Sequence, residues 1–359
     1  AKEDFYLSVF MPVHSGGKEI FMNYKKIKTS TVCFENPPLI LNSAAVAGTK
    51  EGKGPLKNCY DMIADDDLCG EKTWEKAESR LQKYALSAVL KKANMSEKQI
   101  DYIFAGDLLN QCCGTHYAQK ESNISFFGLY GACSTMAQSL ILSAMAVDGG
   151  FAKYCIAQTS SHFCSSEKQY RFPLEYGGQR PPTSQWTVTG SGAAIVSENG
   201  AGNCITYATV GKIIDLGIND ANNMGAAMAP AAADTIVTHF NDTGRTPDYY
   251  DLILTGDLAK VGSDITKSLV LQNGYDISKN YDDCGNLVFY KEKQDVHSGA
   301  SGCGCSAIVL CSYILNRMNM GELKRVLFVG TGALMSPLNL LQGDSIPAIA
   351  HAVSIEKIC

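Results

Sequence analysis

The residue best placed to carry out chemistry is Cys133, which stands in the run Gly-Ala-Cys-Ser-Thr at residues 131–135. The apolar and aromatic stretch before it, residues 124–130, is typical of a buried strand. Residues 136–146 contain good helix formers and no Gly or Pro. We therefore expect Cys133 at the start of a buried helix, where free backbone N–H groups and the positive end of the helix dipole meet.

Such a position lowers the pKa of a thiol and attracts anions. Cys133 is therefore a candidate nucleophile, and together with Ser134 it is also a candidate binding site for a carboxylate. A simpler alternative is a small residue that fills a tight turn, because free Cys is often only buried packing.

The elements that position Cys133 occur twice in the chain. Strands ending in Gly-Asp are expected at residues 102–107 and 252–257. Each is followed by a turn containing Cys-Ser, a helix and a further apolar strand, within residues 131–157 and 304–329. This recurrence predicts an internal duplication. We expect a duplicated α/β fold of five layers, αβαβα, with largely parallel sheets covered on both faces.

The sequence between the repeats suggests the boundaries. We expect an N-terminal half at residues 22–200 and a C-terminal half at residues 201–359. Residues 1–21 are interpreted as an extension or a tag, because Met22 looks like a natural start.

Each half is expected to carry an excursion. An insertion around residues 275–294 should contain a hairpin near Gly285. In the first half, residues 160–182 are expected to form a long loop, and its Arg and aromatic residues are typical of a functional or interface segment.

Composition limits the function classes. Of 359 residues, 45% are hydrophobic and 19% are charged, which fits a globular chain with a large core. The net charge of −5 argues against a nucleic-acid partner. Apolar runs are too short to span a bilayer, so any membrane association should be peripheral or through partners. The 14 Cys lack the paired spacing of a zinc site, so we expect reduced intracellular thiols, no metal site and no cofactor.

A duplicated half with Cys at the start of a buried helix resembles the thiolase/β-ketoacyl synthase superfamily. The resemblance implies that Cys133 occupies the position of an acyl-accepting nucleophile. It also implies two partner groups, one in the turn after the second Gly-Asp strand and one in the loop before the second buried helix. Here the first position has Asp257 instead of His, and His297 lies near the second. His162 is another candidate to approach Cys133, although a structural role for His297 is an equally good interpretation.

Longer strings resemble the stage V sporulation protein AD family, from about Thr31 to the C-terminus. They include DYIFAGDLLNQ, FGLYGACST, VDGGFAK, MGAAMAPAAADT, YDLILTGDL and SGCGCSA. The resemblance implies a non-catalytic relative of the thiolases that binds dipicolinic acid. It also implies that the protein acts with other SpoVA proteins at the spore inner membrane. Together they would move calcium dipicolinate into the developing spore and release it on germination. By analogy with the superfamily, we also expect a homodimer that pairs through the strand at residues 126–130.

A site for dipicolinate needs donors for two carboxylates and an apolar slot for a flat ring. An ionised Asp257 cannot donate a hydrogen bond and would repel an oxyanion, which favours binding over catalysis. Arg171 or Arg180 could supply a guanidinium, although a surface salt bridge is an equal alternative for each. Calcium could bridge the ligand to Asp107 or Asp257. The candidate ligand-binding set is Cys133, Ser134, Asp107, His162, Asp257, Ser298, Gly299, Gly332, Arg171 and Arg180. The alternative function is a condensing-type acyltransferase that uses Cys133 with His297 or His162.

Overall fold

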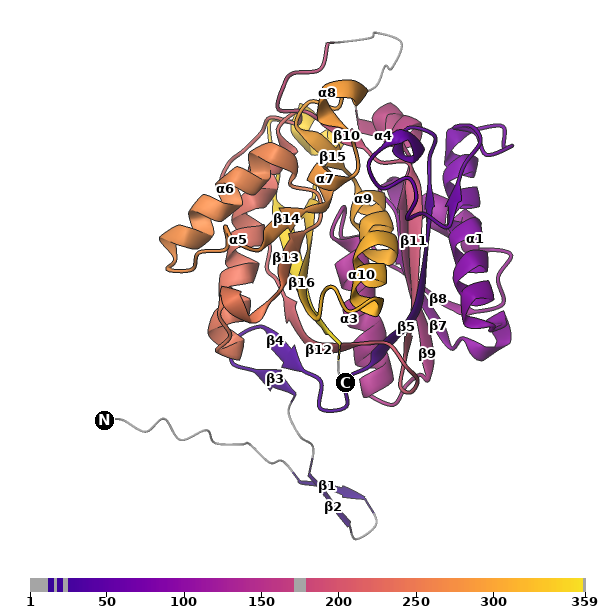
Figure 1. Ribbon diagram of the computed structural model, residues 1–359, viewed down its shortest axis with the longest axis vertical. Helices are drawn as coiled ribbons and strands as arrows, with labels where there is room; N and C mark the ends of the chain where they lie inside the picture. The colour runs from indigo at the N-terminus through magenta and orange to yellow at the C-terminus, as the bar shows by residue number, and fades with distance from the viewer. Residues whose placement is uncertain (1–11, 16–17, 22–24, 171–178, 358–359) are drawn as a thin grey trace.

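The computed structural model describes residues 12–15, 18–21, 25–170 and 179–357. Arg171 and most of residues 1–21 lie outside the described residues. The short strands β1 (Pro12–Ser15) and β2 (Lys18–Phe21) pair with each other and lie apart from the main body (Figure 1).

Two sets of strands form one large sheet in a repeated order. From the edge inward, the first set is β8 (Ser125–Gly128), β7 (Tyr102–Gly106), β9 (Tyr154–Ser161), β11 (Gly190–Ser197) and β5 (Leu39–Ala47). The second set, also from its edge inward, is β14 (Tyr281–Asp283), β13 (Leu252–Thr255), β16 (Arg325–Ala333), β17 (Ala348–Glu356) and β12 (Asn203–Val210). The sets join where β12 pairs with β5. Parallel and antiparallel pairings also match between the sets, as an internal duplication predicts.

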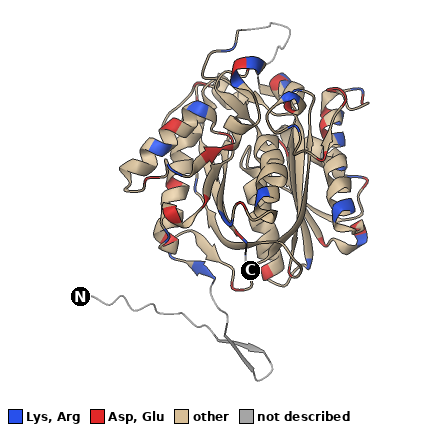
Figure 2. Ribbon diagram, viewed as in Figure 1, with Lys and Arg blue, Asp and Glu red and all other residues tan. Residues whose placement is uncertain are grey.

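Helices cover both faces of each set, which gives the five layers (Figure 1). The central layer contains α3 (Thr135–Asp148) and the continuous run of α9 (Cys303–Ile308), the π-helix η6 (Val309–Ile314) and α10 (Leu315–Asn319). One outer layer contains α1 (Trp74–Ala93) and α2 (Cys113–Gln119), and the other contains α5 (Met224–Thr243) and α6 (Ala259–Gln272). Acidic and basic residues are interspersed on the outer helices α1, α5 and α6 (Figure 2).

Smaller elements complete the fold. These are β3 (Lys26–Ile27), β4 (Thr31–Cys33), η1 (Glu51–Lys53), β6 (Met62–Ile63), η2 (Glu97–Gln99), η3 (Asn110–Cys112), α4 (Phe163–Tyr170), β10 (Gln185–Thr187), η5 (Pro247–Tyr249), α7 (Cys284–Leu287), α8 (Lys291–Gln294), β15 (Gly299–Ser301) and α11 (Pro337–Leu341). In the described parts of the chain, each helix is too short or too polar to cross a membrane.

Three sequence-based expectations about secondary structure are wrong. Strand β8 lies at the edge of the sheet and is largely exposed, with Phe127 50% exposed, so it is not a buried strand. The expected hairpin near Gly285 is the helical turn α7, which Asp283 caps by accepting a hydrogen bond from the Gly285 N–H at 2.9 Å. The excursion after β9 contains helix α4 where only a loop was expected.

Candidate functional site

A strained turn presents Cys133 at the start of α3. Ala132 has a φ of +48°, in the left-handed region, and the N–H of Ser134 donates to the carbonyl of Gly131 at 3.0 Å. Strand β16 packs closely on this turn, since a Cβ at Gly332 would lie 2.5 Å from the carbonyl oxygen of Gly131. Gly332 therefore shapes the turn by permitting close backbone approach.

Asp257, just after β13, lies beside Cys133. Its Oδ1 accepts a hydrogen bond from the Thr331 hydroxyl at 2.7 Å, and its Oδ2 accepts from the Gly302 N–H at 2.8 Å. The thiol of Cys133 lies next to this carboxylate. Burial raises the pKa of Asp257 to about 6, although its hydrogen-bond donors favour the ionised form.

The thiol of Cys133 is held in its protonated form. Burial, followed by the negative charge of Asp257, raises the pKa of Cys133 well above its ordinary value. The expectation that the start of the helix lowers this pKa is therefore wrong: the loss of hydration and a neighbouring carboxylate outweigh the helix dipole.

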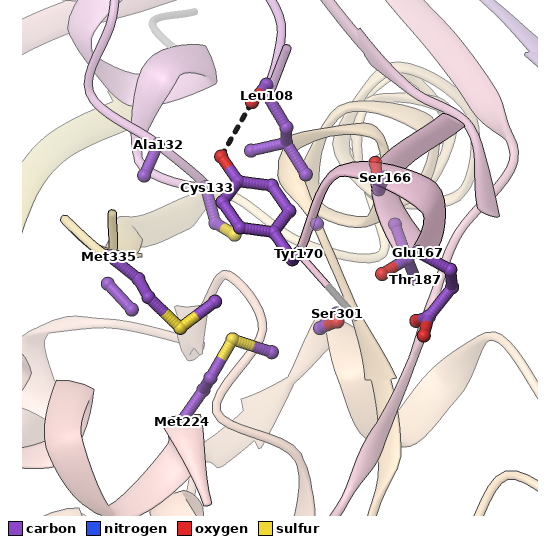
Figure 3. Close-up of a pocket in the computed structure, with 12 residues that line it drawn as sticks. Leu108, Ala132, Cys133, Ser166, Glu167, Tyr170, Thr187, Met224, Ser301 and Met335 are labelled. Carbon is purple, nitrogen blue, oxygen red and sulfur yellow. Dashed lines mark hydrogen bonds between the residues drawn. The ribbon is translucent and has the colours of Figure 1, made fainter. Parts of the chain in front are cut away.

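Cys133 lines a cavity with a volume of about 40 Å³. Its lining is Leu108, Ala132, Cys133, Ser166, Glu167, Tyr170, Thr187, Met224, Ser301, Gly302, Ala333 and Met335. Figure 3 shows the thioether groups of Met224 and Met335 close together on one side and the Tyr170 ring above the sulfur of Cys133. The Tyr170 hydroxyl donates to the carbonyl of Leu108 at 2.7 Å, which fixes the ring in place.

Two hydroxyl groups in this lining have no protein partner among the described residues. They belong to Ser166 on α4 and Ser301 at the end of β15, and both are buried. A buried hydroxyl without a partner is costly unless a ligand or water completes it. Sequence reasoning missed both residues and the lining Glu167, because α4 was taken for a loop and the stretch before Ser301 directed attention to His297, Ser298 and Gly299 instead.

Other predicted site residues have structural partners and do not line the cavity. The Ser134 hydroxyl donates to the carbonyl of Gly131 at 2.7 Å. Asp107 accepts hydrogen bonds from the Leu109 N–H at 2.8 Å and from the N–H and hydroxyl of Thr115 at 2.7 and 2.6 Å. The Asp107 carboxylate is therefore occupied by donors from the protein itself. It does not line the cavity, where it was expected to contact a ligand.

Neither candidate histidine lines the cavity. His162 binds the carbonyl of Asp67 through Nε2 at 2.7 Å and accepts the Cys164 N–H at Nδ1 at 3.2 Å. Burial lowers the pKa of His162, so its ring is neutral, and the ring anchors the loop that contains Asp67. His297 has a φ of +51° and its Nε2 lies 3.6 Å from Asp295. Within the described residues, the cavity lining contains no group in the role of a catalytic His.

The remaining candidates surround the site. The Ser298 hydroxyl accepts the Val261 N–H at 3.3 Å at the start of α6. Gly299 has a φ of +139° and packs against Gly285. The Arg180 guanidinium lies 5.0 Å from the centre of the Trp186 ring and donates to a backbone carbonyl. No cluster of three or more His, Cys, Asp or Glu side chains arranged to hold a metal occurs in the described part of the chain.

The fold defines the class of the protein. It is similar to 3-oxoacyl-[acyl-carrier-protein] synthase III from Aquifex aeolicus VF5, with a TM-score of 0.55, 12% identity, and coverage of 89% of this chain and 99% of that one. It is equally similar to cerulenin-bound OleA of Xanthomonas campestris, with a TM-score of 0.55, 12% identity, and coverage of 92% and 100%. The chain therefore has the thiolase-like fold of the condensing enzymes.

Within that class the family is specific. The family model "Stage V sporulation protein AD (SpoVAD)" matches residues 28–356. The stage V sporulation protein AD of Bacillus subtilis (strain 168) is 47% identical over 327 residues, which cover 91% of this chain and 96% of that protein. The chain belongs to the stage V sporulation protein AD family.

Proposed function

We propose that this chain is a non-enzymatic, dipicolinate-binding component of the SpoVA complex, which takes part in dipicolinate uptake into the developing spore and its release on germination. Membership of a sporulation protein family supports a role in the spore. The observation that carries the non-enzymatic part is the buried Asp257 carboxylate beside the Cys133 thiol, which keeps that thiol protonated.

This pair is unsuited to acyl transfer. A condensing enzyme needs a thiolate and donors that stabilise an oxyanion. Asp257 opposes both, because its charge raises the thiol pKa and repels a developing negative charge. Below pH 6 the neutral form of Asp257 is favoured and the repulsion is lost. The neighbouring thiol is then still protonated and remains a weak nucleophile.

The cavity suits a flat molecule with carboxylate groups. Met224 and Met335 offer an apolar surface for a ring, and the hydroxyls of Ser166 and Ser301 offer donors for carboxylate oxygens. The negative charge of Asp257 beneath Cys133 weakens binding of a bare dianion. We infer that calcium or protons on the ligand strengthen binding.

The partners and the location also belong to this proposal. We infer that the chain acts with SpoVA membrane proteins as a peripheral component at the spore inner membrane. A homodimer through β8 is supported by the position of that strand at an open sheet edge and by the exposed ring of Phe127.

Titration calorimetry with dipicolinate, with and without calcium, tests the proposal. Isophthalate, which lacks the ring nitrogen, is the matched control ligand. We expect saturable binding of dipicolinate, binding that persists in Cys133→Ala, and no mass increase of the protein after incubation with a panel of acyl-CoAs. An acyl adduct on Cys133 that disappears in Cys133→Ala would instead support a condensing-type acyltransferase. Absence of both heat and thermal stabilisation would leave only an architectural role.

A further inference from the structure

Two segments next to the cavity expose a group of large apolar side chains. Ile213 and Leu216 are 60% and 68% exposed on the segment that leads into α5, and Leu338 and Leu341 are 64% and 87% exposed on α11. We call these four residues the apolar patch. Single exposed apolar residues are ordinary, but four on adjoining segments are typical of an interaction surface.

The two segments are held together by an ordered network. Ile214 and Ala348 exchange backbone hydrogen bonds of 2.8 Å in both directions, and the Ile346 N–H donates to the carbonyl of Ile218 at 2.7 Å. The Ser345 hydroxyl also donates to the Asp215 carboxylate. The segments therefore form one supported surface.

Neighbouring side chains divide this surface into an inner and an outer face. Ile214 and Ile218 pack against the core cluster around α5, as does Leu340 from α11. The four patch residues on the same segments are exposed and are not part of that cluster, so they form the outer face.

The charged groups on the same segments are mostly acidic. Residues 211–223 and 334–347 carry Asp215, Asp220 and Asp344, all exposed. Their one lysine, Lys212, has its Nζ 3.0 Å from Asp234. The patch is therefore an apolar surface with a negative rim.

We propose that the apolar patch docks a basic amphipathic segment, with Leu- or Ile-like residues on one face and Lys or Arg beside them, from a membrane protein partner. Apolar burial supplies the attraction, and the three carboxylates select positive charge. The membrane origin of the partner rests on the proposed function, and cytoplasmic loops of membrane proteins carry an excess of Lys and Arg. The acidic rim disfavours an anionic bilayer and also a second copy of the same surface.

The position of the patch links docking to the ligand. The segment with Leu216 runs into Met224, and α11 with Leu338 begins just after Met335. Met224 and Met335 both line the cavity. A partner seated on the patch therefore contacts segments that are continuous in sequence with two residues of the cavity lining.

Fluorescence anisotropy with the full chain tests this proposal. The probe is a labelled 18-residue amphipathic peptide of Leu and Lys, and the matched probe has Glu in place of every Lys. We expect binding of the Lys peptide alone, weakened at least about tenfold by Leu338→Gln combined with Leu341→Gln and by Asp220→Asn combined with Asp344→Asn. Leu271→Gln, at a 58% exposed leucine on α6, is the control and should leave binding unchanged.

Three results would overturn the proposal. These are equal loss of binding in Leu271→Gln, binding of the Glu peptide, or an intact Lys-peptide affinity in both patch variants. Sedimentation with phosphatidylcholine/phosphatidylglycerol vesicles and analytical ultracentrifugation, repeated with the Leu338/Leu341 double variant, would reveal a lipid or a second copy as the occupant instead. Dipicolinate calorimetry on the same variants separates the two proposals, because we expect it to be unaffected.

Discussion

The carboxylate of Asp257, in the loop after β13, lies beside the thiol of Cys133, in the turn before α3. The same carboxylate is fixed by the hydroxyl of Thr331 and by the backbone of Gly302. A buried acid held by these two donors keeps its position, so the thiol has a fixed negative charge beside it. This arrangement keeps Cys133 protonated and leads to the first prediction.

Asp257→Asn should make Cys133 more reactive. Removing the negative charge lowers the thiol pKa, so we expect the rate of alkylation by iodoacetamide at pH 8 to rise about tenfold or more. Peptide mass spectrometry measures the rate at each Cys. Cys59, which is partly exposed in a separate loop, is the internal control and should react equally in both proteins. An unchanged Cys133 rate would contradict the proposed effect of Asp257.

The two unpartnered hydroxyls should serve the ligand more than the fold. We expect Ser166→Ala and Ser301→Ala each to weaken dipicolinate binding several-fold in calorimetry, while thermal stability is unchanged or slightly higher, because a buried orphan hydroxyl is lost. Ser143→Ala removes a hydroxyl of the same kind on α3 that does not line the cavity. It should leave binding intact, and equal effects in all three variants would refute a ligand role.

Binding of dipicolinate should strengthen as the pH falls through about 6. Burial raises the pKa of Asp257 to about 6, so this group is negative above that pH and neutral below it. Picolinic-type carboxyl groups stay ionised in this range, and the loss of like-charge repulsion should tighten binding at least about threefold between pH 7.5 and 5.5. Calorimetry at both values checks this. In Asp257→Asn this change in affinity between the two pH values should vanish. An equal change in both proteins would assign the pH dependence to another group.

Glu51 should make stability depend on pH. It is fully buried, its Oε1 accepts the Thr189 N–H at 3.0 Å, and burial raises its pKa from 4.5 to about 7. Because the folded state holds this proton more tightly, stability falls as the pH rises from about 4.5 to 7 and then levels off. The contribution is about 3 kcal/mol.

Urea unfolding of Glu51→Gln and the wild type at pH 5 and pH 8 measures this contribution. We expect the variant to gain stability relative to the wild type on going to pH 8. Glu198→Gln changes an exposed carboxyl and is the control, expected to show no such gain. A constant difference between Glu51→Gln and the wild type at both pH values would be the contrary result.

Phe127→Glu should prevent dimer formation. The Phe127 ring is 50% exposed on edge strand β8 and stacks on Phe104 at 5.0 Å between ring centres. A charge there would be buried by strand pairing with a second copy. Light scattering after gel filtration should show a dimer for the wild type and a monomer for Phe127→Glu. Phe151→Glu, at a 76% exposed residue elsewhere, should remain dimeric.

Local signals in the sequence predicted much of the fold. The apolar spacing of residues 74–93 predicts a helix, and α1 occupies the same residues, capped by Thr73 and by the left-handed Asn94. The five layers followed from the repeated elements. Errors arose where tertiary position decided the outcome. The apolar strand β8 lies at a sheet edge. The sequence pattern predicts a helix only at residues 231–240, after Pro230, whereas α5 begins at Met224 and passes through that proline.

The site was only partly predictable. The sequence revealed the Asp in place of a His after β13, but the proximity of Cys133 and Asp257 depends on contact between segments far apart in the chain. The position of Cys133 at the start of a helix also predicted the wrong direction for the shift in its pKa, since local sequence patterns do not report burial. Ser166, Glu167 and Met335 carry no spacing signal, because their side chains meet only in the folded cavity.

The order of the strands also limits how large an assembly can grow. The sheet ends at β8 on one side and at the short, half-buried β14 on the other. If a second copy pairs through β8, two-fold symmetry uses the β8 edges of both copies at once. Such pairing closes at this edge: it gives a dimer with two cavities and two acidic-rimmed surfaces, and the sheet of that dimer ends at the short β14 strand of each copy.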